Sequence, residues 1–362
     1  MKIAQIAPLY EAVPPHLYGG TERIVAYLTD GLVRRGHDVT LFASADTQTS
    51  AELVPVRERA IRLDPSPLKA DHAAHLSMLD EVRRRAHGFD VLHFHVDLVH
   101  FPFFEALSER TVTTLHGRLD MSDLDNAYAR WPSYPLVSIS DAQRRHLPDA
   151  NWVRTIHHGV PPDLFQPSSR PGDYLAFLGR ISPEKRPDRA IAVAARAGMP
   201  LKIAAKVDRV DQAYWDDVIA PLVKANANVE FVGEIGDADK SDFLRNAAAL
   251  LFPIDWPEPF GLVMIEAMAC GTPIIAWRNG SVPEVIENVV TGFVVSSEEE
   301  AVAAIRQIHR LDRTKIRRRF EHRFTTDIMA AAYESLFGSL HRSKIMIGSA
   351  KHSLGLVAVG TK

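Results

Sequence analysis

The sequence contains a single cysteine, Cys270, among its 362 residues. One cysteine excludes an intramolecular disulfide and a cysteine-rich zinc site. Cys270 ends an apolar run, residues 264–270, and this position favours a small buried residue over a reactive thiol. A secreted domain stabilised by disulfides is therefore excluded.

The sequence also lacks a large net charge and long apolar runs. The formal net charge is only -3, which gives no support for a protein that binds nucleic acid with its whole surface. No stretch approaches the ~18 to 20 apolar residues of a membrane-spanning helix. The first residues, interrupted by Gln5 and Pro8, do not resemble a signal peptide. We expect a cytoplasmic protein, with peripheral contact to the inner face of a membrane left open. The sequence does not determine the oligomeric state.

Short apolar runs alternate with amphipathic stretches along most of the chain. This alternation predicts parallel sheets built from βα units. Predicted strands lie at residues 2–7, 38–43, 91–95, 111–115, 136–139, 153–156, 174–178, 201–205, 229–232, 250–252, 273–276 and 293–295. Predicted helices lie at residues 21–35, with Thr21 as the N-cap, and at 186–197, 211–225, 240–247, 261–270, 298–310 and 313–337.

A segment rich in proline and serine, residues 164–173, separates two such series. We therefore predict an α/β fold of two Rossmann-like, doubly wound domains that face each other across a cleft. The N-terminal domain would span 1–166 and the C-terminal domain 167–325. A terminal helix, 326–342, would pack back on the N-terminal domain, and 343–362 would form a poorly ordered tail. The basic stretch 313–319 favours a solvated helix face, with contact to an anionic surface as the alternative.

The strongest motif runs from Pro257 to Pro273 and contains Glu258 and Glu266. It follows an apolar strand, and a helix is expected to begin near Phe260. The first N–H groups of a helix have no intrahelical partner and attract anions. Ionised carboxylates accept hydrogen bonds from sugar hydroxyls. By spacing alone, a helix cap and a surface ion pair explain the two acids equally well.

Two further motifs place glycine and basic residues at strand ends. Gly179 ends a predicted strand, and Arg180 and Lys185 follow it, which suits a diphosphate site, with an ordinary basic loop as the alternative. Gly19 and Gly20 lie between the first strand and the first helix, where doubly wound folds bind phosphate. They do not form a Gly-x-Gly-x-x-Gly motif, which disfavours a nicotinamide dehydrogenase.

These motifs together resemble glycosyltransferase family 4, the retaining enzymes of GT-B fold, over roughly residues 2–337. The most specific part is the Glu-x7-Glu segment from Glu258 to Glu266 with the following Ala-Met-Ala-Cys-Gly-Thr-Pro. Gly179-Arg180 with Lys185 agrees with the same family. The resemblance implies front-face transfer from a nucleoside-diphosphate sugar, without a metal or other cofactor. The acceptor would be a carbohydrate, a lipid-linked glycan or a small molecule.

The resemblance also implies a role for each motif residue. Arg180 and Lys185 would neutralise the leaving diphosphate, Glu266 would hold the ribose, and Glu258 would orient the sugar. Donor contacts would also come from backbone groups of Phe260, Gly261 and Leu262 and from Gly19 and Gly20. His116, at a first-domain strand end, would face the donor sugar, with a structural histidine as the alternative. The base pocket is expected near residues 231–236.

Several polar patterns admit a metal site, but each has a simpler explanation. Asp237-x-Asp239 precedes a predicted helix and is explained by capping, and Asp123-x-Asp125 has the same spacing. His93, His95 and Asp97 share one strand face, where a polar cluster at a strand end is favoured. An acceptor role for His95 or Asp97 stays open.

The sequence leaves three further points open, namely two residue roles and the exact activity. His157-His158 is expected to form an interdomain turn, and Trp256 suits either the donor pocket or simple packing. A nucleotide-sugar epimerase or a sugar phosphorylase on the same frame is the main functional alternative. A non-catalytic nucleotide-sugar-binding protein is the other.

Overall fold

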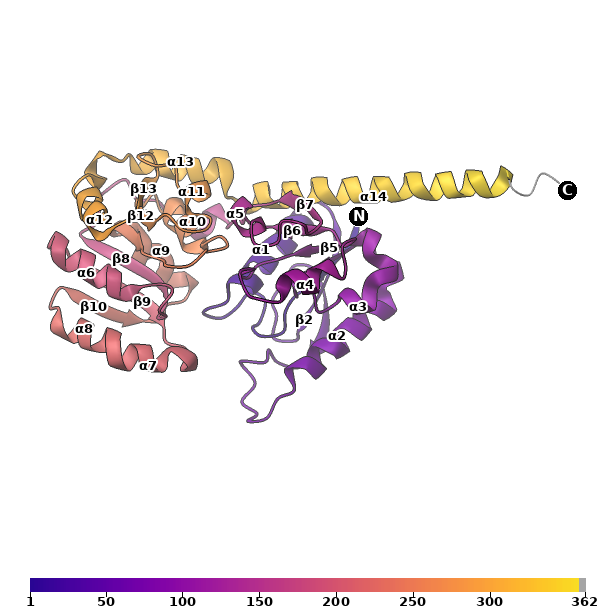
Figure 1. Ribbon diagram of the computed structural model, residues 1–362, viewed down its shortest axis with the longest axis horizontal. Helices are drawn as coiled ribbons and strands as arrows, with labels where there is room; N and C mark the ends of the chain where they lie inside the picture. Colours follow the sequence, from indigo (N-terminus) through magenta and orange to yellow (C-terminus); the bar gives the residue numbers. More distant parts are fainter. Residues whose placement is uncertain (358–362) are drawn as a thin grey trace.

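The computed structural model describes the backbone of residues 1–357 and the side chains of residues 1–342. It contains two α/β domains that lie side by side, with a long helix, α14, running from the second domain along the first (Figure 1). Helix α14 continues to Val357, so the helix predicted for 326–342 is longer than expected and takes in part of the predicted tail. The rest of that tail, 358–362, lies outside the described residues.

The first domain is built on a seven-stranded sheet in the order β3-β2-β1-β4-β5-β6-β7, with every neighbouring pair parallel. Its strands are β1 (Lys2–Ile6), β2 (Asp38–Ser44), β3 (Glu52–Arg57), β4 (Val91–Phe94), β5 (Thr111–Thr114), β6 (Leu136–Ser138) and β7 (Trp152–Thr155). Strand β3 was not predicted. It forms the edge of the sheet, and only Val54 of its residues is fully buried.

The second domain is built on a six-stranded sheet in the order β10-β9-β8-β11-β12-β13, again entirely parallel. Its strands are β8 (Tyr174–Arg180), β9 (Leu201–Lys206), β10 (Val229–Gly233), β11 (Ala247–Phe252), β12 (Ile274–Trp277) and β13 (Gly292–Val295). Both orders are those of doubly wound folds. The predicted pair of parallel, doubly wound domains is confirmed.

The helices connect successive strands and cover both sheets (Figure 1). In the first domain they are α1 (Gly20–Arg34), α2 (Asp71–Arg85), α3 (Phe101–Phe104), α4 (Leu124–Ala129) and α5 (Asp141–Arg144). The others are α6 (Pro187–Ala197), α7 (Gln212–Tyr214), α8 (Ala220–Ala225), α9 (Asp237–Arg245), α10 (Leu262–Ala269), α11 (Val282–Val285), α12 (Glu298–Ile305), α13 (Arg313–Arg323) and α14 (Thr326–Val357).

Three helix predictions were wrong in detail. Helix α1 begins one residue earlier than expected, so its N-cap is Gly19 and not Thr21. Asp237 does not cap a helix, because Gly236 is the N-cap of α9 and Asp237 lies in its first turn. The helix expected over 211–225 is interrupted by a π-helical turn, Trp215–Ile219, between α7 and α8.

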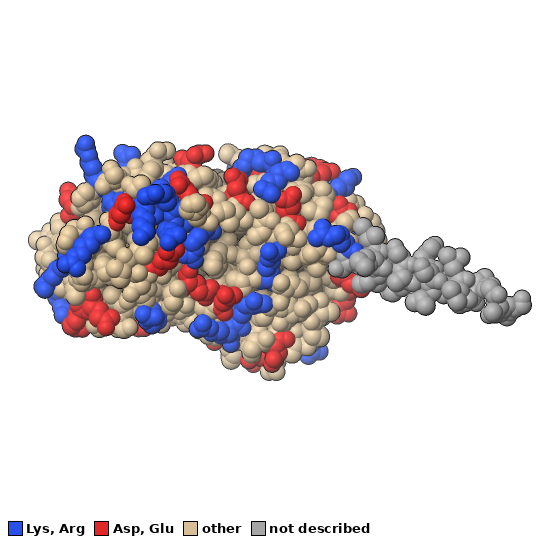
Figure 2. All heavy atoms as spheres, turned by 90° about the horizontal axis from the view of Figure 1, so that it is seen from above, with Lys and Arg blue, Asp and Glu red and all other residues tan. Residues whose placement is uncertain are grey.

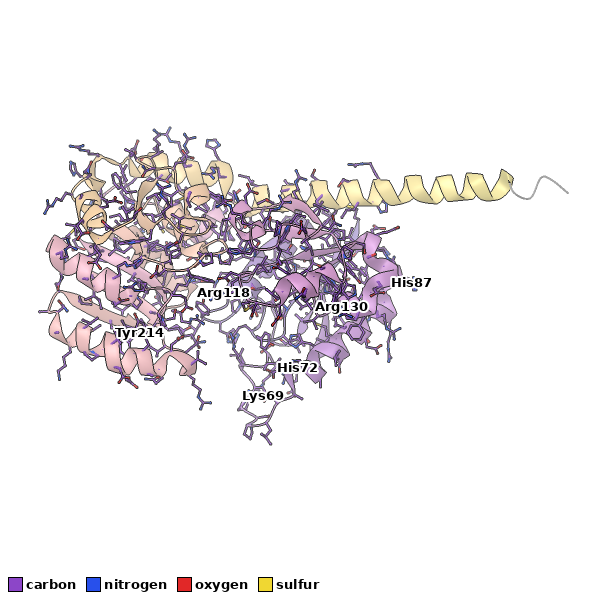
Figure 3. The ribbon with its side chains drawn as sticks, in the orientation of Figure 1. Lys69, His72, His87, Arg118, Arg130 and Tyr214 are labelled. Atoms are coloured by element: carbon purple, nitrogen blue, oxygen red, sulfur yellow. The ribbon has the colours of Figure 1, made fainter. Side chains whose placement is uncertain are left out.

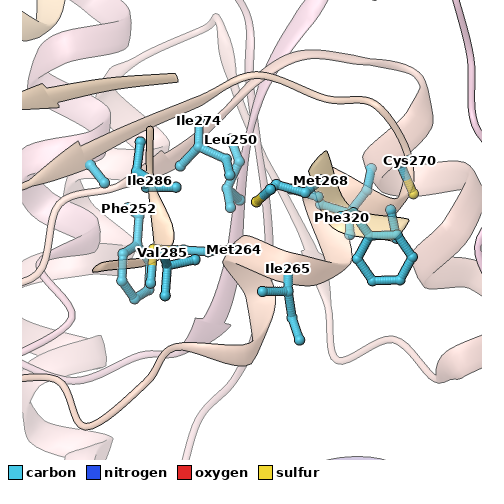
Figure 4. Close-up of a cluster of buried hydrophobic side chains, with 14 of the residues drawn as sticks. Leu250, Phe252, Met264, Ile265, Met268, Cys270, Ile274, Val285, Ile286 and Phe320 are labelled. Atoms are coloured by element: carbon cyan, nitrogen blue, oxygen red, sulfur yellow. The ribbon is translucent and has the colours of Figure 1, made fainter. Parts of the chain in front are cut away.

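One part of the second domain's core lies between its sheet and helices α10 and α13, and another lies on the opposite face under α6 and α12. Helix α10 is apolar almost all round, and Met264, Ile265 and Met268 are completely buried (Figure 4). They pack against β11 and β12 on one side and Phe320 of α13 on the other. Cys270 is buried in this cluster, and burial raises the pKa of its thiol to about 12, as expected for a structural residue.

Helix α14 packs back on the first domain, although it follows the second in the chain. Met329, Tyr333 and Phe337 join the buried cluster beneath α1 and the first sheet. Gly31 of α1 allows the close approach, since a Cβ atom there would lie 3.0 Å from the Thr326 side chain and 3.1 Å from that of Ala330. The two domains are therefore joined by the chain at two places, residues 156–173 and the start of α14.

The basic stretch at the start of α13 is not a uniformly solvated face. Arg313 is buried and Arg317 half-buried, and both donate to backbone carbonyls of neighbouring segments. Arg319 pairs with Glu287 at 3.1 Å. On the face seen in Figure 2, Lys and Arg side chains lie among Asp and Glu side chains. The solvated-face interpretation was therefore wrong for Arg313 and Arg317.

Candidate active site between the two domains

A cavity of about 510 Å³ lies between the two domains and is lined by residues of both. All ten residues predicted for the site line it: Gly19, Gly20, His116, Arg180, Lys185, Glu258, Phe260, Gly261, Leu262 and Glu266. The order of each sheet reverses at its middle, between β1 and β4 and between β8 and β11. The cavity lies at the carboxyl ends of these strands, where doubly wound sheets bind ligands.

Two loops of the second domain place a lysine and a glutamate side by side. Lys185 follows β8, and Glu258 follows β11, the neighbouring strand in the sheet. The Lys185 ammonium forms an ion pair with the Glu258 carboxylate, and both side chains are largely buried. The Trp256 indole also donates to Glu258 at 3.1 Å, and its ring lies 4.9 Å from the Lys185 ammonium. Trp256 is therefore part of the cavity wall.

Arg180, the last residue of β8, is held by three carboxylates. Its guanidinium lies 2.5 Å from Glu184, 3.5 Å from Asp211 and 3.8 Å from Asp208. These contacts fix the position of the Arg180 guanidinium and its N–H groups at the cavity wall. The side chain keeps a free edge, because it remains 29% exposed. Arg180 can therefore bind an anion without losing its supports.

Helix α10 begins at the cavity with an unusual backbone turn. Its N-cap, Gly261, has φ +78°, and a Cβ atom there would lie 2.9 Å from both Met264 and Phe252. Only glycine adopts this conformation at little cost and leaves room for those side chains. The helix begins at Leu262, slightly later than expected. Its first N–H groups lack intrahelical acceptors and point from the helix start at the cavity.

Glu266, one turn inside α10, is buried and faces two cations. Lys240 of α9 lies 3.5 Å from Glu266 and 3.2 Å from Asp237. Asp237 also pairs with Arg23 of α1, across the domain boundary. Burial disfavours the charged guanidinium, but the charges of Asp237 and Glu266 outweigh it and raise the pKa of Arg23. A charge network therefore links the start of α1 to α10.

The first domain contributes Gly19, Gly20 and Glu22 from the start of α1. Gly20 faces Leu262 of the second domain, since a Cβ atom at Gly20 would lie 3.6 Å from the Leu262 side chain. Glu22 is buried in the cavity wall. Burial, assisted by the charge of Glu11, raises the pKa of Glu22 to about 7.

His116 follows β5 and forms part of a histidine cluster. Its Nε2 lies 2.8 Å from Nδ1 of His95, and its ring stacks on His158 at 5.2 Å. Burial lowers the pKa of His116 to about 3, so the ring is neutral at pH 7. His93 turns away to Thr114, at 2.8 Å, on the face covered by α14. Asp97 is not among the residues that line the cavity.

No three His, Cys, Asp or Glu side chains in the described part of the chain are grouped so as to hold a metal ion. Asp237, the first acid of the Asp237-x-Asp239 pattern, forms ion pairs with Arg23 and Lys240. Metal independence itself stays a prediction. Over the same residues, no helix combines the length and apolarity that crossing a membrane requires.

Several cavity residues were not found from the sequence. Lys240 pairs with Glu266, and Arg23 pairs with Asp237. Each partner is distant in the sequence, so no local motif indicated either residue. Tyr10 and Arg62 form a pair at the first-domain side of the cavity, 5.6 Å apart. Arg118 lies on the edge of the first domain that faces the second, with its guanidinium 5.1 Å from the Trp256 ring (Figure 3).

The expected base pocket near residues 231–236 also meets the cavity. Glu234 and Ile235 line it, together with Lys206 at the end of β9. The Glu234 carboxylate accepts a hydrogen bond from the Tyr18 backbone N–H at 3.2 Å, which connects this loop to the glycine-rich loop. Its assignment to a nucleobase stays a prediction.

Glu22 gives a pH-dependent prediction for this wall of the cavity. A carboxyl whose pKa is raised from 4.5 to about 7 stabilises the fold fully below pH 4.5, and this stability is lost as the pH rises through 7. Glu22→Gln should therefore become more stable than the wild type as the pH rises from 5 to 8, by on the order of 2 kcal/mol. Urea unfolding at each pH measures this difference. The exposed Glu58→Gln is the control, and an equal effect of Glu22→Gln at both pH values would contradict the prediction.

Comparison with known protein families accounts for most of the chain. The family model described as "Glycosyltransferase Family 4" matches residues 18–164, and "Glycosyl transferases group 1" matches residues 165–324. D-inositol 3-phosphate glycosyltransferases of Mycobacterium bovis and Mycobacterium tuberculosis are 30% identical over 256 residues, 62% of this chain and 53% of theirs. The chain thus spans about half the length of these relatives.

Solved structures share the fold over 94% of the chain. A glycosyltransferase involved in avilamycin A biosynthesis gives a TM-score of 0.70 at 24% identity, with 98% of that chain covered. Sucrose-phosphate synthase from Thermosynechococcus elongatus gives 0.78 at 20%, with 99% covered. HepE from Anabaena, in complex with UDP and glucose, gives 0.75 at 18%, with 100% covered.

Two consecutive family models therefore match the two domains, and the architecture is that of GT-B structures. The ten residues predicted for the site line the cavity between those domains. The chain belongs to glycosyltransferase family 4, with GT-B fold.

Proposed function

We propose that this protein is a retaining glycosyltransferase, which moves a sugar from a nucleoside-diphosphate sugar to an acceptor hydroxyl. The observation that carries the proposal is the meeting of Arg180 and Lys185 with Glu258 and Glu266 in one interdomain cavity. Arg180 ends β8, Lys185 and Glu258 lie in the loops after β8 and β11, and Glu266 lies in α10, all at the switch point of the second sheet. Cations for a diphosphate and carboxylates for hydroxyls therefore lie within the length of one ligand.

Each charged residue keeps binding capacity beyond its present partners. Lys185 has three donors, and Glu258 takes one of them. Glu258 accepts from Lys185 and Trp256, which leaves further lone pairs of its carboxylate for sugar hydroxyls. Glu266, supported by Lys240, would accept from the ribose hydroxyls. We infer that Arg180, Lys185 and the start of α10 bind the diphosphate.

The reaction would proceed on one face of the sugar. The bond between the anomeric carbon and the diphosphate oxygen breaks, the acceptor oxygen bonds to the same face, and its proton passes to the leaving diphosphate. The protein positions both substrates and stabilises the charge that develops on the leaving group. We propose that Arg180 and Lys185 serve this purpose without a metal. Glu258 orients the sugar and is not assigned as a nucleophile.

The structures of HepE hold UDP, or UDP-glucose, in a similar fold. UDP-glucose is therefore the first donor to test, within a thermal-shift panel of UDP-, GDP-, ADP- and dTDP-sugars and their nucleotides. A ligand that binds only the folded state raises the melting temperature. At a hundred times its Kd it increases the free energy of unfolding by about 2.7 kcal/mol.

Glu266→Ala should lose most of that thermal shift, because the buried carboxylate is removed from the cavity wall. Glu230→Ala removes an exposed glutamate of β10 and should keep the shift in full. If no member of the panel shifts the melting temperature, the proposed donor class is wrong. If Glu266→Ala keeps the full shift, the assignment of Glu266 is wrong.

A further inference from the structure

A chain of three hydrogen-bonded side chains runs from the interior of the first sheet to the cavity. Gln5 lies in β1, His95 directly after β4, and His116 two residues after β5, so they come from three adjacent parallel strands. Gln5 Oε1 lies 2.8 Å from His95 Nε2, and His95 Nδ1 lies 2.8 Å from His116 Nε2. Gln5 and His95 are buried, and only His116 reaches the cavity.

The positions of the hydrogens along this hydrogen-bonded series follow from Gln5. Gln5 Oε1 is a carbonyl oxygen and can only accept, so His95 Nε2 carries a hydrogen. Burial lowers the pKa of His95 well below its ordinary value, so the ring is neutral and its Nδ1 carries none. His95 Nδ1 then accepts from His116 Nε2–H. Because His116 is neutral too, its Nδ1 is left with a lone pair.

That last nitrogen is buried and has no hydrogen-bond partner among the described residues. The neighbouring ring does not satisfy it, since His158 stacks on His116 at 5.2 Å and its own Nδ1 also lacks a partner. An unpaired buried acceptor destabilises the folded protein. A ligand that donates a hydrogen to it would recover this cost.

We propose that Gln5 and His95 are positioning residues, which hold His116 with Nε2 protonated so that Nδ1 accepts a hydroxyl of the bound substrate. A phosphate or carboxylate oxygen would meet a lone pair and be repelled, whereas a sugar hydroxyl donates. The sugar, of donor or acceptor, therefore lies at His116, and the diphosphate lies toward Arg180 and Lys185. The proton positions along Gln5, His95 and His116 do not depend on the proposed function. Only the identity of the ligand at His116 rests on it.

The opposite proton order gives a distinct alternative. If the Gln5 amide were reversed, its NH2 group would donate, each proton would move along the chain, and His116 Nδ1 would become a donor. Two-bond ¹H–¹⁵N correlation spectra of ¹⁵N-histidine-labelled protein distinguish the two tautomers. We expect His116 to be protonated at Nε2 from pH 6 to 8, without any ligand present.

Two substitutions of Gln5 separate acceptor chemistry from packing. Gln5→Glu, when ionised, can only accept from His95 Nε2–H and should keep the His116 tautomer. Gln5→Met keeps the length of the side chain but removes the acceptor, so His116 should become a mixture of tautomers. Thermal unfolding checks that each variant folds, and His95→Phe, which removes the acceptor from His116, replaces Gln5→Met if that variant does not.

The same variants give a binding readout. Gln5→Met should bind the nucleoside-diphosphate sugar of the thermal-shift panel about tenfold more weakly, and the free nucleotide unchanged, since only the sugar contacts His116. Nδ1-protonated His116 in the wild type, or an unchanged tautomer in Gln5→Met, would overturn the proposal. So would an equal loss for nucleotide and nucleotide sugar, or no loss for either. If no nucleotide sugar binds the wild type, the proposed function fails, while the spectra still decide the proton order.

Discussion

Lys185→Ala should lower the rate of glycosyl transfer by about 10²–10³-fold, the usual effect of removing one donor to a developing negative charge. The ammonium lies between the Glu258 carboxylate and the Trp256 ring, so its position is fixed before substrate binds. Because the side chain is only 16% exposed, water replaces it poorly. The substitution also leaves Glu258 buried with Trp256 as its remaining donor.

Steady-state release of nucleotide in the presence of acceptor measures this effect. Lys202→Ala removes the same charge from β9, where the ammonium pairs with Glu230 outside the cavity, and should leave the rate within about twofold of the wild type. Lys185→Arg keeps the charge but changes the shape of the donor, and should recover only part of the rate. A Lys185→Ala rate within threefold of the wild type would show that the diphosphate is neutralised elsewhere.

The alternation of apolar runs predicted nearly all of both sheets, because strands buried on both faces read as continuous apolar segments. It missed β3 and α2, although the exposed edge strands β7 and β10 were predicted. Strand β3 is an edge strand with one fully buried residue, and α2, which was also missed, has a weakly apolar face and three arginines in its last turn. The break in the helix expected over 211–225 comes just before Pro221, which has no backbone N–H for the helical hydrogen bond, so a local signal was overlooked.

The motif residues of the site could be predicted from the sequence. The ion pairs and hydrogen bonds that connect them to distant residues could not. Arg180 ends β8, and Lys185 and Glu258 lie in the loops that follow β8 and β11, so the fold alone places them at one edge of the sheet. The pair between Arg23 and Asp237 joins residues 214 positions apart in two domains, and the contact between Gln5 and His95 spans 90 positions. Such contacts require the register of the sheet and the docking of the domains, which a single sequence does not reveal.

Arg313→Met should destabilise the second domain by about 3 kcal/mol, because several buried acceptors lose a charged hydrogen-bond donor. The Arg313 guanidinium donates to the carbonyl oxygens of Ser168, Arg245 and Ala247 and to the Thr272 hydroxyl, at 2.8 to 2.9 Å. Burial lowers its pKa to about 10, so it stays charged at pH 7. One side chain thus satisfies acceptors on the interdomain segment, the α9–β11 junction and the turn before β12.

Methionine fills much of the same space but leaves those acceptors unsatisfied, so the loss should exceed that of cavity formation alone. Urea unfolding at pH 7 measures it, and Arg318→Met, at an exposed position of the same helix, should change the free energy of unfolding by less than about 0.5 kcal/mol. Because Arg313 does not line the cavity, nucleotide affinity at low temperature should stay at the wild-type value. Equal stability of the two variants would mean that water replaces the guanidinium, and loss of affinity in the folded variant would mean that this junction positions the donor site.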